Sequence, residues 1–69
     1  MEVFKISLAA ARVNAEYTQE EVARELSVSK STIVSWEKGK TTPPTLYLKA
    51  LLDLYNIKAD NLFLPKSTH

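Results

Sequence analysis

Apolar side chains recur every three or four positions along most of the chain, which is the spacing of one face of an α-helix. The longest such stripe, in the second half, consists of Leu48, Leu51, Leu52 and Tyr55. A shorter stripe within residues 7–14 contains Leu8 and Ala11. Five helical segments can be read along the chain and no strand, so we expect an all-α fold.

Polar residues around the other apolar stripes predict two further helices. Thr18 and Glu21 have the T-x-x-E spacing of a capping box. Ser29 is a second N-cap candidate, and Gly39, the only glycine, supplies the left-handed residue that ends a helix. Only Ser27 and Val28 separate the end of the helix that Thr18 caps from Ser29, which caps the next one. Helices joined by a turn of three or four residues cross at ~90–120°, so the spacing predicts a helix-turn-helix unit.

The remaining segments complete the predicted bundle. The consecutive prolines of the TTPPT sequence exclude a helix before Thr45. Thr45 is expected to cap a fourth helix that ends near Asn56, and a short fifth helix is expected at about Ala59–Phe63. We therefore expect one five-helix domain over residues 1–65, followed by a tail, residues 66–69.

Composition excludes several classes of function. The 69 residues include no cysteine, which excludes a disulfide scaffold and a thiolate zinc site and fits a reducing cytoplasm. The apolar run Ile6–Ala11 is shorter than the ~7–15 residues of a signal peptide, and no run approaches the ~20 of a membrane span. No nucleophile–base pair or metal-ligand spacing occurs, and the single histidine, His69, is in the expected tail. We expect a cytoplasmic protein with no enzymatic activity, membrane segment, metal, cofactor or small-molecule ligand.

The distribution of charge is more informative than its sum. Residues 1–28 carry a net charge of −2, from three basic and five acidic side chains. Residues 29–49 carry +3, from four lysines and one glutamate. Positive charge therefore gathers around the second helix of the predicted helix-turn-helix, as expected for a surface that binds nucleic acid.

The outward face of that second helix has an unusual composition. Ser31 and Ser35 lie four positions apart on one face, with Lys30 and Val34 at its borders. A helix surface that binds nothing more usually carries Glu, Lys or Ala. A solvated lysine such as Lys30 would by itself need no further explanation. Lysine can donate to guanine, serine can pair with several base edges, and valine can rest on a thymine methyl group. The face is therefore a candidate for base contacts.

The stretch TQEEVARELSVSKSTIVSWEKGKTTP, which begins at Thr18, resembles the helix-turn-helix domain of the phage repressor, Cro and XRE family. The specific part is the succession T-Q-x-x-x-A, S-x-x-T-I and W-E-x-G-K at fixed spacing. The resemblance covers about Leu8 to Phe63, and the segments ARVNAEYTQ and FLPKS are most similar to short prophage regulators of Gram-positive bacteria. It implies a five-helix bundle of the lambda-repressor type, in which the third helix, residues 29–38 and the second of the helix-turn-helix, enters the DNA major groove.

The resemblance also implies site residues by position. Contacts to DNA bases are implied for Lys30, Ser31, Val34 and Ser35. Contacts to DNA phosphates are implied for Gln19, Ser29, Lys38 and Lys40, although Ser29 is also needed as a cap and the two lysines also suit the negative end of a helix. A structural ion pair is implied between Arg12 and Glu37. The family often has glycine where this chain has Glu16, Ser27 and Asn56.

The expected function is that of a sequence-specific DNA-binding transcriptional regulator, similar to a repressor or Cro protein. Its expected partners are double-stranded DNA and a second copy of the chain, on a two-fold operator. The candidate interface between copies consists of Leu54, Leu62, Phe63 and Leu64. An antitoxin or a protein-interaction adaptor with the same fold is the alternative. An adaptor would more usually present acidic or large apolar residues where this chain presents lysine, serine and valine.

Overall fold

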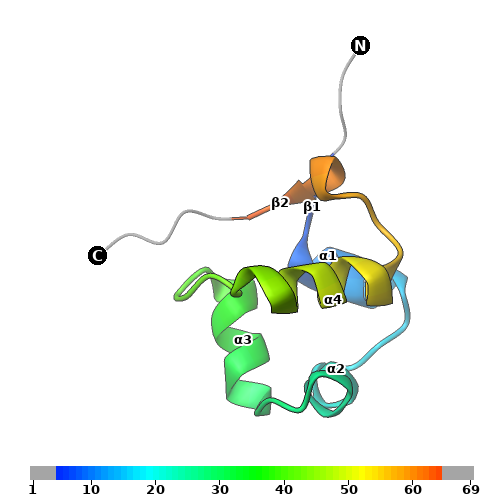
Figure 1. Cartoon of the computed structure of the whole chain (residues 1–69). Coiled ribbons are helices and arrows are strands. Elements are labelled where there is room, and N and C mark those ends of the chain that lie inside the picture. The colour runs from blue at the N-terminus through cyan, green and yellow to red at the C-terminus, as the bar shows by residue number, and fades with distance from the viewer. Residues whose placement is uncertain (1–4, 65–69) are drawn as a thin grey trace.

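The computed structural model describes residues 5–64 (Figure 1). In chain order the elements are β1 (Ile6–Ser7), α1 (Leu8–Asn14), α2 (Gln19–Leu26), α3 (Lys30–Lys38), α4 (Thr45–Tyr55), the 3₁₀ helix η1 (Ala59–Asn61) and β2 (Leu62–Phe63). The expected tail, residues 66–69, lies outside the described residues. The domain is mostly helical, as expected, but the described part has four α-helices and a 3₁₀ turn where five helices were predicted.

The segment after α4 accounts for two errors of the predicted fold, the fifth helix that was expected and the strands that were not. Only Ala59–Asn61 forms a helical turn, and it is of the 3₁₀ type. The next two residues are extended and pair in parallel with β1, so that Ile6 lies opposite Leu62. The pairing buries Leu62 in the core and gives the backbone partners that a longer helix would otherwise supply. β1 lies within residues 4–8, which alternate apolar and polar side chains, a strand signal that the prediction missed. The two residues of β2 are both apolar and give no such sign.

The helix starts follow the expected caps with one exception. Thr18 and Glu21 form a capping box, in which the N–H of Glu21 donates to Thr18 Oγ1 at 3.1 Å and the N–H of Thr18 donates to Glu21 Oε1 at 2.8 Å. Ser29 Oγ accepts from the backbone N–H three residues on, at 3.3 Å. Thr45 does not cap α4, contrary to the prediction. Pro44, with φ −57° and ψ 154°, takes the N-cap position without a side-chain hydrogen bond, and Thr45 is the first helical residue.

Four described residues have a left-handed backbone. Gly39 (φ 77°) ends α3 and Asn56 (φ 55°) ends α4, as expected. Ser27 (φ 56°) ends α2, and Glu16 (φ 65°) lies between α1 and α2. Because their Cβ atoms crowd the backbone in this region, Ser27 and Glu16 each carry strain of order 1 kcal/mol.

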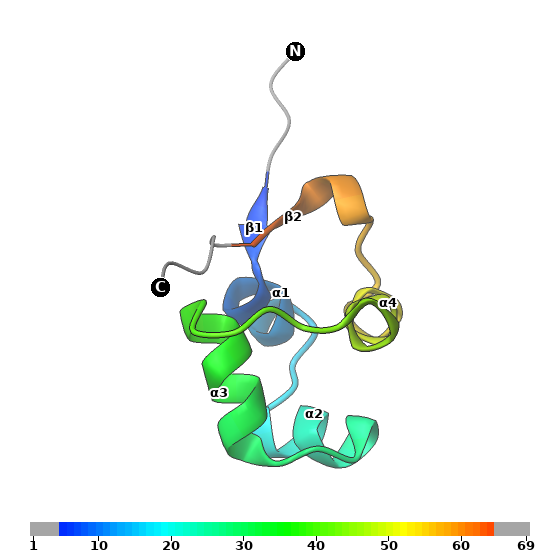
Figure 2. The same cartoon turned by 60° about the vertical axis from the view of Figure 1, so that its left-hand side comes forward.

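One core joins the apolar stripes of all four α-helices. It consists of Leu8, Ala11, Val22, Ala23, Ile33, Trp36, Leu51, Tyr55 and Leu62. Figures 1 and 2 both place the β1–β2 pair at one end and α2 at the other, with α1 and α4 between them. Leu62 was predicted to contact a second copy of the chain. It is only 8% exposed, so it packs in the core of its own domain instead. Phe63 next to it is 52% exposed. None of the helices described is long and apolar enough to span a bilayer.

Candidate nucleic-acid interface

The connection between α2 and α3 is a closed turn. Its first residue, Ser27, donates its N–H to the carbonyl of Arg24 at 3.2 Å. The N–H of Val28 donates to the carbonyl of Ala23 at 2.9 Å, and Ser29 then caps α3. The two helices cross steeply: Figure 1 looks nearly along α2 while α3 runs across the view. The crossing confirms the helix-turn-helix that the spacing predicts.

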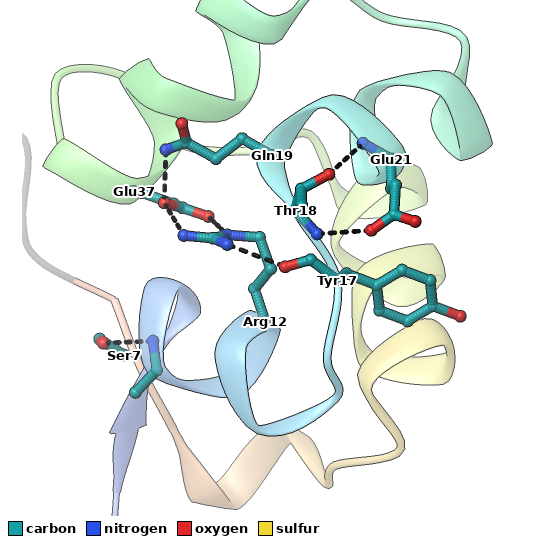
Figure 3. A network of polar contacts seen from close by, with 8 residues as sticks. Ser7, Arg12, Tyr17, Thr18, Gln19, Glu21 and Glu37 are labelled. Carbon is teal, nitrogen blue, oxygen red and sulfur yellow. Dashed lines mark hydrogen bonds and ion pairs between the residues drawn. The ribbon is translucent and has the colours of Figure 1, made fainter.

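A polar network on the inner side of α3 holds it to α1 and α2 (Figure 3). Arg12 Nε donates to Glu37 Oε2 at 2.7 Å, and Arg12 Nη2 lies 3.4 Å from Oε1. Gln19 Nε2 donates to Glu37 Oε1 at 3.0 Å, and Arg12 Nη1 donates to the carbonyl of Tyr17 at 2.9 Å. One carboxylate of α3 therefore receives donors from two other helices.

The Arg12–Glu37 pair is largely shielded from water, which makes its loss costly. The side chains of Arg12 and Glu37 are 15% and 8% exposed. The hydrogen bond to Glu37 raises the pKa of the Arg12 guanidinium, against the opposing effect of burial. With both charges paired and satisfied, the network fixes the angle at which α3 leaves the bundle. The outer face of α3 thus has a defined direction.

The residues expected to contact bases do lie together at the outer side of α3. Lys30 and Ser31 are exposed, while Val34 and Ser35 are half-buried. Ser29 Oγ lies 2.9 Å from Ser31 Oγ and 2.9 Å from the hydroxyl oxygen of the residue after it, so the first turn carries a chain of hydroxyl groups. The result is a face of short side chains, mostly hydroxyl groups, with Lys30 at its edge. Short side chains of this kind let a helix approach base edges closely.

Lys30 has a partner that sequence reasoning missed. Its Nζ lies 3.0 Å from Glu20 Oε2, between the N-terminal ends of α3 and α2, and both side chains are more than half exposed. The hydrogen bond from Lys30 is the main cause that lowers the pKa of Glu20. A lysine in the first turn of a helix is unfavourable beside the positive end of the dipole, which is a signal that a carboxylate should be near. No pattern in the sequence chooses Glu20 among the acidic residues of α2.

The expected phosphate-contacting residues are distributed around α3. Gln19 is half-buried and gives one amide hydrogen to Glu37, which leaves its second hydrogen and the carbonyl oxygen for other partners. Lys38 and Lys40 are exposed at the C-terminal end of α3. The structure records no ion pair for either lysine among residues 5–64.

Other surfaces of the described residues are less suited to chemistry. A shallow pocket of about 390 Å³ lies between α2 and α4, lined by Glu25, Leu26, Ala50, Asp53 and Leu54. Leu54, which was expected at an interface between copies, lines this pocket. Over residues 5–64 no three acidic or histidine side chains gather as metal ligands would.

Comparison with known proteins agrees with this geometry. Residues 8–62 match the helix-turn-helix family, which covers most of the chain. The chain is 34% identical over 47 residues to an uncharacterized HTH-type transcriptional regulator of Methanocaldococcus jannaschii, across 68% of this chain and 71% of that protein. No solved structure matches significantly. The relative is archaeal, so it does not support the expected likeness to prophage regulators of Gram-positive bacteria.

Proposed function

The chain belongs to the helix-turn-helix family, and on that premise we propose that it is a sequence-specific DNA-binding transcriptional regulator rather than an enzyme. In this proposal α3 lies in the major groove and its outer face reads base edges. The observation that carries the proposal is the fixed orientation of that face. The network around Glu37 directs inward the polar groups that hold α3, and the hydroxyls of Ser31 and Ser35 remain outside it.

The base contacts follow from the chemistry of the face. Lys30 can donate to O6 and N7 of guanine, and Ser31 and Ser35 can donate to or accept from several bases. Val34 lies beside them and can contact the methyl group of thymine. Because the side chains are short, these contacts require the α3 backbone to enter the groove deeply.

Phosphate contacts would hold the helix in register without reading sequence. Lys38 and Lys40 are exposed at one end of α3 and carry ammonium groups suited to this role. At the other end, Ser29 caps the helix beside the turn. The remaining amide hydrogen of Gln19 lies beside Glu37, in the last turn of α3. Contacts at both ends would fix the long axis of α3 along the groove.

We further propose that two copies bind a two-fold site. Each domain offers about four base-contacting side chains, and a good contact contributes ~1–3 kcal/mol of discrimination. Two copies double that number and require half-sites about one helical turn, ~34 Å, apart. Of the predicted interface, Phe63 is the residue that remains largely exposed. Origin in a Gram-positive prophage and action as a repressor stay predictions from the sequence.

The experiment is selection of the purified protein on a pool of random DNA duplexes at low salt. The proposal predicts enrichment of an inverted repeat, and loss of enrichment in a Lys30→Ala, Ser31→Ala double variant. A folded protein that enriches no sequence would contradict the proposal and favour the alternative, an antitoxin or adaptor that binds a protein partner. Circular dichroism of the variant shows whether its fold is retained.

A further inference from the structure

The contact between Lys30 and Glu20 joins the two helices of the unit at their exposed N-terminal ends. Glu20 is the second residue of α2, and Lys30 is the first residue of α3. Their charged groups are 3.0 Å apart, although the residues are ten positions apart in the chain. Arg24, on the same helix, is nearer to Glu20 in the sequence, only four positions on. The described residues nevertheless show no ion pair between Glu20 and Arg24. The crossing of α2 and α3 therefore selects Lys30 as the partner of Glu20.

The helix dipoles act in opposite ways on the charges of Glu20 and Lys30. A carboxylate near the start of α2 is favoured by the helix dipole, whereas an ammonium at the start of α3 is not. The backbone N–H of Glu20 adds to the effect of Lys30 in lowering the pKa of this carboxylate. Glu20 thus suits its place at the start of α2, whereas Lys30 depends on Glu20 for a favourable position.

An exposed ion pair of this kind adds little to stability because water screens both charges. Its effect on the position of the lysine is a separate matter. A lysine ammonium on four flexible carbons can reach many acceptors, and phosphate oxygens are the strongest acceptors near a DNA groove. An ammonium that already donates one hydrogen to Glu20 has two hydrogens left, which is the number that O6 and N7 of one guanine accept.

We propose that Glu20 is a specificity-determining positioning residue, which holds the ammonium of Lys30 over base edges and keeps it away from the phosphates. This inference rests on the proposed function. The carboxylate repels phosphate oxygens, so the Glu20–Lys30 pair approaches DNA only where the lysine meets uncharged acceptors. Part of the attraction of Lys30 for any DNA is lost, and discrimination between base pairs is gained.

The test repeats the selection with Glu20→Gln and with a matched control, Glu25→Gln. Both changes remove one exposed carboxylate from α2, but Glu25 lines the pocket on the side of α4. A Lys30→Met variant first identifies the base pair in the selected site that depends on Lys30. In Glu20→Gln we expect the preference at that base pair to fall about threefold or more. Preferences elsewhere in the site should stay, and Glu25→Gln should retain them all.

Salt dependence gives a second measurement. If Lys30 moves to a phosphate in Glu20→Gln, log K against log salt should steepen by ~0.9 for each bound subunit. Addition of Lys30→Met should remove that increase. Equal effects of Glu20→Gln and Glu25→Gln on every base pair would overturn the inference, and so would an effect of Glu20→Gln that persists in the Lys30→Met background. If the wild-type protein selects no sequence, the proposed function fails first and the inference falls with it.

Discussion

Glu37 is the residue on which the position of α3 most depends, because it accepts hydrogen bonds from both Arg12 and Gln19. Glu37→Ala would leave the largely buried guanidinium of Arg12 without a carboxylate. We expect the free energy of unfolding in urea to fall by ~3–5 kcal/mol, the usual effect of breaking a buried ion pair. In an Arg12→Met, Glu37→Met double variant no charge is stranded, so the loss should be smaller. A Glu37→Ala variant as stable as the wild type would show that the network does not hold α3.

Tyr55 gives the stability a dependence on high pH. Its side chain is 5% exposed, and burial, with a further effect of the Glu37 charge, raises its pKa to about 12. In the unfolded chain a tyrosine loses its proton near pH ~10. Between these two pH values the folded state keeps a proton that the unfolded state releases. The contribution of protonated Tyr55 to the free energy of unfolding is therefore complete below pH ~10 and is lost as the pH rises toward 12.

The corresponding measurement is urea unfolding of the wild type and Tyr55→Phe at pH ~8 and ~11.5. Other groups titrate in both proteins, so the difference between the two isolates Tyr55. We expect the wild type to lose up to about 2 kcal/mol more than Tyr55→Phe over this range, from ~1.4 kcal/mol for each pKa unit. Parallel losses in the two proteins would contradict the assignment.

At the level of single residues, the sequence was most informative where local rules or a family position applied. The caps at Thr18 and Ser29 follow from short-range spacing, and the resemblance placed Arg12 opposite Glu37. The partners Gln19–Glu37 and Lys30–Glu20 were not foreseen. Both depend on the direction in which α3 leaves the turn, and no local pattern encodes that direction.

At the scale of elements, α2 and α4 begin in different ways, and this difference can be measured. Thr18 accepts a backbone hydrogen bond within a capping box, whereas Thr45 follows Pro44 and makes no cap. Thr18→Ala should therefore lower stability by about 1 kcal/mol, and Thr45→Ala, the same chemical change at another helix start, by much less. Thermal unfolding of both variants makes the comparison. A larger loss in Thr45→Ala would contradict the assigned caps.

The four α-helices could be predicted from apolar spacing and capping residues because those signals act over a few positions. The segment after α4 could not. Ala59–Asn61 forms a single 3₁₀ turn because the following residues are held by pairing with β1, at the other end of the described chain. Contacts between distant segments decided its structure, and the short apolar run Leu62–Leu64 is compatible with either a helix or a strand.

For the whole molecule, salt dependence reports how many subunits bind DNA. If Lys38 and Lys40 of two subunits contact phosphates, log K for the selected duplex should fall against log salt with a slope of ~ −4, from ~0.9 for each contact. A single bound subunit predicts a slope of ~ −2. Titration of a fluorescent duplex at several salt concentrations, with analytical ultracentrifugation of the complex, distinguishes the two. A slope near zero would exclude the electrostatic part of the proposal.

The central claim is that the outer face of α3 distinguishes one DNA sequence from another. The most direct measurement is the ratio of dissociation constants for a shuffled and a selected duplex, at fixed salt, in the wild type and in a Ser31→Ala, Ser35→Ala variant. Alanine favours helix at least as well as serine, so the variant should stay folded. We predict a ratio of ~10³ or more for the wild type and one at least about tenfold lower for the variant. Equal affinity of the wild type for both duplexes, or an undiminished ratio in the variant, would contradict the account.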